Sequence, residues 1–363
     1  PAIVGAGEKA DEIADGDLLL IDGAAGEVVA QPDEQTLADF AERQKADAAH
    51  RAMLAQYKDK EGATSDGRRV IIEGNIGTPD DAVRVAELGG EGVGLFRSEF
   101  LFMDRTDLPS EEEQFAAYKK ACEIMQGKPV IIRTLDIGGD KEVPALALEK
   151  EQNPFLGYRA IRICLNQPEL FLIQLRALLR AAQYGDLRIM FPMISSVDEV
   201  RDAKQVLEQA KDMLTAEGVP FNPNVKVGIM VEIPVAAVCA DVLAKEVDFF
   251  SIGTNDLIQY SCAVDRINEK ISYLYRPLHP GVLRLIAMTA KAANENGIEV
   301  GVCGEMAGTA GMAPVLCGLG VTNLSMSASA MLAAKADLAK HSYDKCRELA
   351  DKLLACASAS DAE

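Results

Sequence analysis

The chain has 363 residues, of which 48% are hydrophobic and 26% are charged, and its formal net charge is −19. This apolar content excludes a disordered chain, and the mixed composition excludes collagen-like and low-complexity classes. The charge disfavours nucleic acids and anionic membranes as partners, unless arginines gather locally. The most apolar stretch, residues 227–243, contains Glu232 and Asp241, so we expect no membrane-spanning segment.

The first 69 residues differ in character from the rest. Residues 1–32 hold two short β-like pieces around a Gly-rich turn, which predicts a hairpin too small for a core of its own. Residues 33–61 are polar and lack Gly and Pro, which predicts a long exposed helix, and we assign residues 33–69 to a linker. The chain opens Pro1-Ala2-Ile3-Val4-Gly5, without an initiator Met or a signal peptide, as the middle of a longer sequence would.

From Val70 onward, apolar runs of strand length alternate with amphipathic segments of helix length. Such alternation is typical of parallel α/β folds, because each crossover between parallel strands needs a long connection. The predicted strands are residues 70–72, 92–96, 129–132, 187–191, 227–231, 248–252, 298–302 and 323–326.

Eight strand–helix units predict an α/β fold of the TIM barrel type, (β/α)8, over residues 70–363, with a helix at the C-terminus. A doubly wound open sheet is the alternative fold. The Gly-rich run 89–94 precedes a strand instead of joining a strand to a helix, and no Walker motif occurs. We therefore expect no dinucleotide-binding or P-loop site.

Polar side chains follow five of the predicted strands. In a barrel of this type, catalytic side chains come from the carboxyl ends of the strands. A single charged residue after a strand is explained by the chain reaching the protein surface there. Polar or charged residues after five strands of one barrel instead indicate a functional site. The segments are Arg97-Ser98-Glu99, Arg133-Thr134-Leu135-Asp136, Glu232, Gly253-Thr254-Asn255-Asp256 and Cys303-Gly304-Glu305.

Four arginines belong to this predicted face. Arg97 and Arg133 lie at strand ends, and Arg159 and Arg266 lie on loops beyond. The forked guanidinium donors suit phosphate or carboxylate groups. Such a cluster would explain how a protein of net charge −19 binds a small polyanion.

Two carboxylates are candidate metal ligands. Glu232 and Asp256 follow neighbouring predicted strands, and carboxylate oxygens are hard donors. Two carboxylates together with substrate oxygens suit Mg²⁺, which retains several waters and uses few protein ligands. The alternative is a salt-bridge network between these carboxylates and the arginines.

The eight cysteines show neither a C-x-x-C pair nor zinc-ligand spacing, which predicts a reduced, cytoplasmic protein with buried thiols. Seven of them lie where core thiols are expected. Cys303 differs because it lies at a strand end beside Gly304, which would leave room for a substrate. A thiol there is a workable proton donor or acceptor.

The chain resembles the C-terminal part of Enzyme I of the sugar phosphotransferase system, the phosphoenolpyruvate–protein phosphotransferases. The resemblance covers nearly the whole chain. Pyruvate phosphate dikinases and phosphoenolpyruvate synthases share several of these motifs, but residues 95–115 and 1–5 look more like Enzyme I. The matching segments are GLFRSEFLFM at 94–103, IGGDK at 137–141, NPFLGYR at 153–159, DFFSIGTNDL at 248–257 and CGE at 303–305.

The resemblance implies a role for each candidate site residue. Arg97, Arg133 and Arg266 would hold the phosphate of phosphoenolpyruvate, and Asn255 and Arg159 would complete the pocket. Glu232 and Asp256 would bind Mg²⁺. Cys303 would protonate the enolate carbon as pyruvate forms. These are also the roles that the residue types suggest.

The family's phosphoryl acceptor is a histidine in a Gly-Gly-x-x-Ser-His type motif of a swivelling domain, and these 363 residues contain no such motif. Residues 1–32 look like the last strands of that domain. The resemblance implies that the chain binds phosphoenolpyruvate without becoming phosphorylated, that the phosphocarrier protein HPr docks on a region outside it, and that it forms a homodimer through the barrel. The alternatives are a dikinase or synthase barrel and a non-catalytic, phosphoenolpyruvate-sensing dimerisation module.

Overall fold

The computed structural model describes residues 3, 7–23, 25–103, 105–139, 141 and 143–363. The opening motif, apart from Ile3, and Asp140 of the IGGDK segment lie outside these residues. The chain divides into two compact units, Pro1–Gln56 and Tyr57–Glu363.

The first unit contains the predicted hairpin and helix. Two antiparallel strands pair Leu19 with Ala30, and the helix begins after Asp33, whose carboxylate accepts a hydrogen bond from the Thr36 amide. The helix ends at Ala55, six residues earlier than predicted, and residues 57–60 belong to the second unit. The elements are η1 (Gly7–Glu12), β1 (Leu19–Asp22), β2 (Glu27–Ala30) and α1 (Glu34–Ala55).

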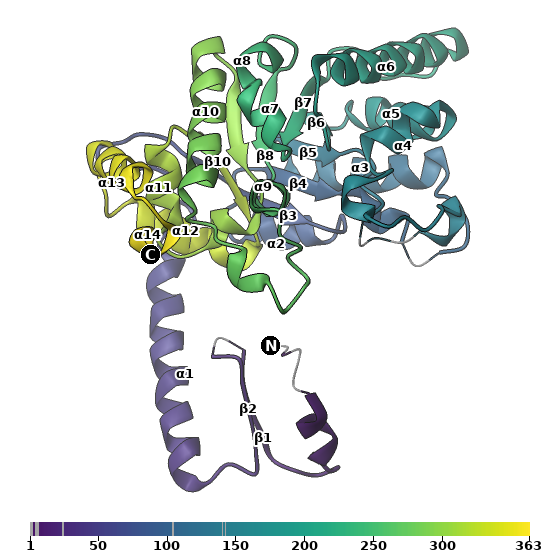
Figure 1. Ribbon diagram of the computed structural model, residues 1–363. Helices are drawn as coiled ribbons and strands as arrows, with labels where there is room; N and C mark the ends of the chain where they lie inside the picture. The colour runs from purple at the N-terminus through teal and green to yellow at the C-terminus, as the bar shows by residue number, and fades with distance from the viewer. Residues whose placement is uncertain (1–2, 4–6, 24, 104, 140, 142) are drawn as a thin grey trace. The chain divides into compact units, whose positions relative to one another are not determined.

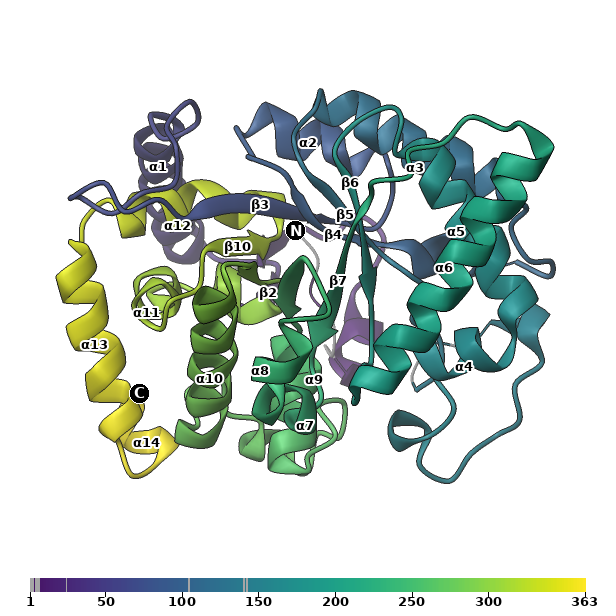
Figure 2. The ribbon, with the colours of Figure 1, turned by 90° about the horizontal axis from the view of Figure 1, so that it is seen from above.

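The second unit is the predicted barrel: eight parallel strands close on themselves, and helices surround them (Figures 1 and 2). The alternative of an open sheet is excluded because the last strand pairs with the first, Asn323 opposite Ile71. The strands are β3 (Ile71–Ile76), β4 (Val93–Arg97), β5 (Val130–Arg133), β6 (Leu187–Phe191), β7 (Lys226–Val231), β8 (Phe249–Ile252), β9 (Glu299–Val302) and β10 (Asn323–Met326).

Two of the longer helices begin at capping residues, whose side chains accept hydrogen bonds from free amide groups of the first turn. Ser110 and Ser196 each form a capping box with the glutamate three residues later, and so fix where α3 and α6 start. Among the described residues, no helix is long and apolar enough to span a membrane. The helices are α2 (Asp81–Glu87), α3 (Glu111–Met125), α4 (Ile161–Asn166), α5 (Pro168–Ala181), α6 (Val197–Glu217), α7 (Pro234–Val238), α8 (Ala240–Leu243), α9 (Thr254–Cys262), α10 (Pro280–Asn296), α11 (Met312–Gly318), α12 (Met331–Leu338), α13 (Tyr343–Ala355) and α14 (Ala359–Ala362).

The first barrel strand differs from its prediction. The apolar run predicts a strand that stops at Ile72, but β3 continues to Ile76. The continuation carries two polar residues: Glu73, which is buried, and Asn75, whose Oδ1 accepts a hydrogen bond from the Ser325 hydroxyl. A strand that places polar residues inside the barrel does not show an unbroken apolar run.

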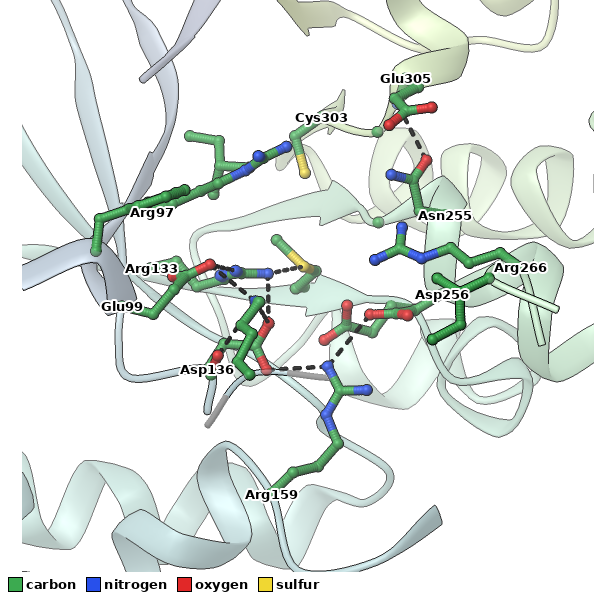
Figure 3. A pocket seen from close by; sticks show the side chains of 18 of the residues that line it. Arg97, Glu99, Arg133, Asp136, Arg159, Asn255, Asp256, Arg266, Cys303 and Glu305 are labelled. Carbon is green, nitrogen blue, oxygen red and sulfur yellow. Dashed lines mark hydrogen bonds and ion pairs between the residues drawn. The ribbon is translucent and has the colours of Figure 1, made fainter. Parts of the chain in front are cut away.

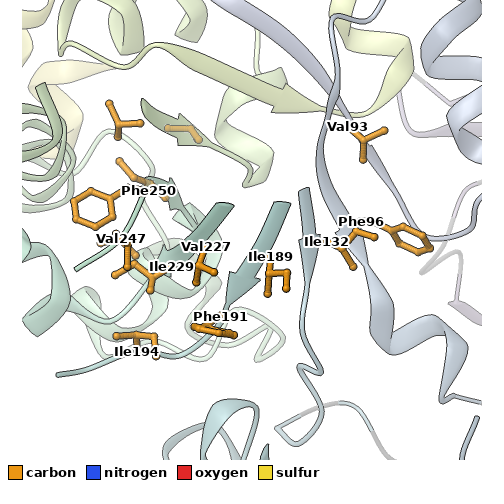
Figure 4. Close-up of a cluster of buried hydrophobic side chains, with 14 of the residues drawn as sticks. Val93, Phe96, Ile132, Ile189, Phe191, Ile194, Val227, Ile229, Val247 and Phe250 are labelled. Carbon is orange, nitrogen blue, oxygen red and sulfur yellow. The ribbon is translucent and has the colours of Figure 1, made fainter. Parts of the chain in front are cut away.

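The hydrophobic core has two layers. The main layer fills the space between the strands and the surrounding helices, and Phe96, Phe191 and Phe250 belong to it (Figure 4). A smaller cluster fills the barrel interior just below the carboxyl ends of the strands. It forms the floor of a cavity at that end of the barrel. Its members are Leu95, Ile131, Met190, Met230, Phe249 and Cys303.

Candidate active site

A cavity of about 540 Å³ opens at the carboxyl ends of the barrel strands. All eight candidate residues from the sequence line it, although 206 residues separate the first from the last (303 − 97). They come from β4, β5 and the segments that follow β5, β7, β8 and β9 (Figure 3). These residues are Arg97, Arg133, Arg159, Glu232, Asn255, Asp256, Arg266 and Cys303.

Two of the arginines are buried and paired. Arg133 forms ion pairs with Glu99 and, at 2.8 Å, with Asp136, while Arg159 reaches Asp136 at 3.0 Å and Asp256 at 3.4 Å. Burial opposes ionisation of Asp136, but Arg133, the Lys141 ammonium and Arg159 hold its pKa well below the usual range. This network locks both guanidinium groups in place before any ligand binds, which lowers the entropic cost of binding.

The other two arginines are available to a ligand. Arg97 and Arg266 form no salt bridge with any carboxylate of the described residues, and both line the cavity. Both are half-buried. A partly desolvated, unpaired guanidinium binds an anion more strongly than one on an open surface. Arg97 and Arg266 are therefore the best placed cations for a phosphate group.

Glu232 and Asp256 lie together on the opposite side of the cavity from Arg97 (Figure 3 shows Asp256). Burial, followed by the charges of Asp256 and Asp136, raises the pKa of Glu232 to about 8. One oxygen of Glu232 accepts the Met193 amide at 2.6 Å, and Asp256 Oδ1 is buried without a hydrogen-bond partner. Two carboxylates that repel each other, one with a bare oxygen, suit a divalent cation.

No group of three or more His, Cys, Asp or Glu side chains in the described part of the chain is arranged as a metal site. A protein site made only of side chains, such as a structural zinc site, would need three or four. Glu232 and Asp256 supply two oxygen donors, which is compatible with a cation such as Mg²⁺ that takes its other ligands from water and substrate.

Cys303 lies at the floor of the cavity and is only 3% exposed. Two hydrogen bonds hold its peptide: its amide donates to the Ile252 carbonyl at 3.1 Å, and its carbonyl accepts from Asn75 Nδ2 at 2.9 Å. Burial raises the pKa of the thiol to about 11, against the opposing effects of a hydrogen bond with Ser251 and the charge of Arg133. The thiol is thus protonated at neutral pH and can serve as an acid.

Asn255 has a fixed orientation. Its Oδ1 accepts hydrogen bonds from the Glu305 amide at 3.2 Å and from the Tyr275 hydroxyl at 3.4 Å. Because the carbonyl end of the amide is occupied, the NH₂ end is the one left to donate to a ligand.

Comparison with known proteins agrees with this arrangement. A family model described as "PEP-utilising enzyme, PEP-binding domain" matches residues 51–343. The chain belongs to this family.

Similar curated proteins are named phosphoenolpyruvate-protein phosphotransferase. Those of Priestia megaterium and Bacillus subtilis (strain 168) are 51% and 49% identical over 361 residues, which is 99% of this chain and 63% of each relative. The protein of Geobacillus stearothermophilus is 49% identical over 99% of this chain and 62% of its own length. This chain therefore spans less than two thirds of the relatives that it matches.

Three further charged residues of the matching segments have a role in the site that the sequence does not reveal. Glu99, Asp136 and Lys141 form the network that holds Arg133 and Arg159, and Lys141 Nζ contacts both carboxylates, at 2.8 and 3.1 Å. Charged residues next to strand ends were the available signal, but which of them pair with each other is a property of the folded barrel.

Two glycines of the matching segments have a packing reason. A Cβ at Gly138, whose φ is +100°, would come within 2.6 Å of the Arg159 Cβ, so the glycine lets Arg159 approach the site. A Cβ at Gly304 would lie 1.9 Å from Thr254 Oγ1. Gly304 therefore allows close packing against Thr254, and it also lines the cavity, so the expectation that it leaves room for substrate stays a prediction.

Proposed function

We propose that this barrel binds phosphoenolpyruvate together with Mg²⁺. The observation that supports this most is the cavity itself, where four arginines face two adjacent carboxylates. Phosphoenolpyruvate carries a phosphate and a carboxylate, and it can also supply oxygen ligands to a cation. The shared family and the names of the relatives point to the same substrate.

We further propose that the complete protein is a phosphoenolpyruvate–protein phosphotransferase. In it, the phosphoryl group would pass to a histidine of the swivelling domain and on to the phosphocarrier protein HPr, with release of pyruvate, as the first step of cytoplasmic sugar phosphotransferase uptake. On this proposal, residues 1–32 belong to the swivelling domain, 33–69 to the linker and 70–363 to the barrel. The part of the relatives that this chain does not cover would hold the acceptor.

The cavity residues divide the chemistry between them. Arg97, Arg133 and Arg266 would hold the phosphate, while Asn255 and Arg159 complete the pocket. Charge that develops on the phosphoryl oxygens and on the enolate oxygen would be stabilised by these fixed donors.

Glu232 and Asp256 would hold the Mg²⁺. Bound there, the cation would neutralise phosphate charge and polarise the enolate oxygen.

Cys303 would supply the proton that converts the enolate into pyruvate. Its thiol lies at the cavity floor and remains protonated because burial raises its pKa to about 11. A non-catalytic sensing module would not need an acid there, so this residue favours the enzyme.

A calorimetric titration of phosphoenolpyruvate tests the proposed substrate. We expect Mg²⁺-dependent binding to the wild-type chain and at least about a tenfold loss of affinity in Arg97→Ala, because a charged hydrogen bond contributes roughly 1.5–3 kcal/mol. Arg97 has no salt bridge in the described residues, so its removal leaves no buried carboxylate unpaired. Arg347→Ala, an exposed arginine on α13, is the matched control. Absence of binding to the folded wild type would reject the proposal.

We also propose a homodimer formed through the barrel. Val235 and Val238 on α7 and Val242 on α8 are 45%, 56% and 43% exposed, and α7 and α8 lie beside α10 on the outside of the barrel (Figures 1 and 2). Burying this apolar surface against a second copy would be favourable. Sedimentation should show a dimer for the wild type and a shift towards monomer for Val238→Asp; a wild-type monomer at high concentration would contradict it.

A further inference from the structure

A small polar cavity lies inside the barrel, on the amino-terminal side of Cys303. Its volume is about 10 Å³, which is room for one water molecule. The interior of a TIM barrel is usually packed with branched apolar side chains. Here the polar residues that line the space are Glu73, Ser251, Glu299, Asn323 and Ser325.

Glu73 is the most unusual of these residues. Its side chain is 2% exposed, and Oε1 is buried without a hydrogen-bond partner. Its carboxylate lies against two glycines of the neighbouring chain segment: a Cβ at Gly92 would meet Oε1 at 2.9 Å, and one at Gly94 would meet Oε2 at 2.6 Å. The barrel therefore makes room for a carboxyl group and leaves one of its oxygens for a small polar partner.

The groups around Glu73 set its protonation. Burial raises its pKa to about 7; Arg188 and the Asn323 amide oppose the rise, while Glu299 and Glu91 add to it. At neutral pH, Glu73 is therefore present both as the acid and as the carboxylate.

The cavity connects two environments. At its upper end, Ser251 lines the cavity and its side chain acts on the Cys303 thiol, which donates to the Ile252 carbonyl at 3.8 Å. At its lower end, Glu299 lines the cavity, is 38% exposed and pairs with Arg188 at 2.8 Å. Polar groups thus extend from solvent at the amino-terminal end of the barrel to the thiol at the floor of the active-site cavity.

We propose that Glu73 returns a proton to Cys303 through one cavity water and the Ser251 hydroxyl. The inference rests on the proposed role of Cys303 as the acid that protonates the enolate. After that step the thiol is a thiolate. The Glu73 carboxylic acid gives its proton to the water, the water gives one to Ser251, and Ser251 gives its own to the thiolate. The net change is one thiol formed and one carboxylate formed, and Glu73 regains a proton from solvent beside Glu299.

The direction of this transfer follows from the two acids. The Glu73 acid, with a pKa of about 7, is much stronger than the Cys303 thiol, with a pKa of about 11, so the proton moves to the thiolate. The thiol is only 3% exposed and its open side is the substrate cavity. A proton path from the amino-terminal side of the barrel lets the thiol regain its proton while product still occupies the active-site cavity.

The test is the ketonisation of enolpyruvate, generated from phosphoenolpyruvate by a phosphatase and followed by ultraviolet absorbance after rapid mixing with excess substrate. Wild type, Glu73→Gln, Ser251→Ala and Glu111→Gln are compared with Mg²⁺ between pH 6 and 9. Glu111 is a partly buried carboxylate that lines neither cavity and does not act on Glu73, so Glu111→Gln is the matched control.

We expect Glu73→Gln and Ser251→Ala to keep the first turnover per site, because the thiol starts protonated. Their later turnovers should slow by about tenfold or more at pH 6, in the range expected for loss of a general acid. The wild-type steady-state rate should fall as pH rises through about 7, as Glu73 loses its proton, and this step should be absent in Glu73→Gln. Phosphoenolpyruvate affinity should be unchanged in both variants.

Other results would overturn the inference. Steady-state rates and pH profiles like those of the wild type in either variant would show that the thiol regains its proton by another route. A slow first turnover with no further slowing would assign Glu73 to the geometry of the site instead. If the wild type does not ketonise enolpyruvate, or if Cys303→Ala does so equally well, the proposed role of Cys303 fails, and this result is distinct from failure of the relay alone.

Discussion

Arg133 and Arg97 lie on adjacent strands at paired positions, but their surroundings differ. Arg133 lies between Glu99 and Asp136, whereas Arg97 has no salt bridge in the described part of the chain. Removing Arg133 would take one cation from two buried carboxylates and leave Lys141 and, at Asp136, Arg159 as their partners. Breaking a buried ion pair costs up to about 3–5 kcal/mol, so the variant would lose stability. Loss of substrate binding in Arg133→Ala would therefore mix a binding effect with a folding effect, and Arg97 is the better residue for a binding test.

Cys303→Ala tests the proposed acid at the level of one side chain. We expect the variant to bind phosphoenolpyruvate normally and to lose exchange of the pyruvate methyl protons with deuterated solvent. Exchange begins when the thiolate removes a methyl proton, so in the wild type it should become faster from pH 6 to 9, because the pKa of the thiol is raised to about 11 and the thiolate fraction grows with pH up to that value. Proton NMR of pyruvate with Mg²⁺ measures the exchange, and exchange that survives in Cys303→Ala would rule the thiol out.

At the scale of single elements, the strands position the cavity residues and the loops complete the site. Arg97 and Arg133 end β4 and β5, and the barrel register places them side by side. Arg159 instead follows a long loop after β5, and its approach depends on Gly138. Residues on strand ends are therefore held by the sheet hydrogen bonds, whereas Arg159 is held mainly by its ion pairs and by Tyr260, whose hydroxyl lies 3.0 Å away.

The capping box of α6 gives a prediction at this scale. Ser196 Oγ accepts the Glu199 amide at 3.3 Å, and Glu199 in turn accepts the Ser196 amide at 3.1 Å. Ser196→Ala should lower the free energy of unfolding by about 1 kcal/mol, because it leaves a helix amide without a partner. Ser196→Thr, which keeps the hydroxyl, should recover most of the loss. Urea denaturation measures both, and equal stabilities of wild type and Ser196→Ala would show that the cap contributes nothing.

At the scale of the whole molecule, charge is unevenly distributed. The chain carries a net charge of −19, but the cavity gathers four arginines and Lys141. Five carboxyl groups, Glu99, Asp136, Glu232, Asp256 and Glu305, lie among them. The cavity is therefore close to neutral without a ligand, and an anion and a cation that bind together would leave it so.

Stability should depend on pH in a direction set by the buried carboxyl groups. Glu73 has a pKa of about 7 in the folded chain against an ordinary value of 4.5, so the folded state keeps its proton where the unfolded state releases it. The contribution of Glu73 to stability is therefore favourable below about pH 4.5 and is lost as pH rises to about 7. Glu232 acts in the same direction, whereas the lowered pKa of Asp136 destabilises the fold in stronger acid.

Glu73→Gln provides the check, because glutamine has a similar shape and no proton to lose. The free energy of unfolding from urea denaturation should fall between pH 5 and 8 in the wild type and fall less in Glu73→Gln. The variant should be the more stable of the two at pH 8. Identical slopes for the two proteins would contradict the raised pKa of Glu73.

The barrel and the eight candidate residues of its cavity could be predicted from the sequence alone. Eight apolar runs that alternate with helix-length segments allow few other folds, and in a parallel barrel the carboxyl ends of all strands lie at one face. For this reason Arg97, Glu232 and Cys303 could be assigned to one site although they are far apart in the chain. The end of α1 and the length of β3 were missed, since neither an early helix end nor a buried polar strand residue has a local signal.

Which polar groups form ion pairs could not be predicted from the sequence and is seen only in the folded barrel. Arg133 and Arg97 follow strands in the same way, yet one is locked between carboxylates and the other is open to a ligand. Glu73 interrupts an apolar run and could be a strand terminus, but the fold buries it against Gly92 and Gly94 inside the barrel. Pairing and burial depend on distances between strands that are remote in sequence, so they exist only once the barrel has closed.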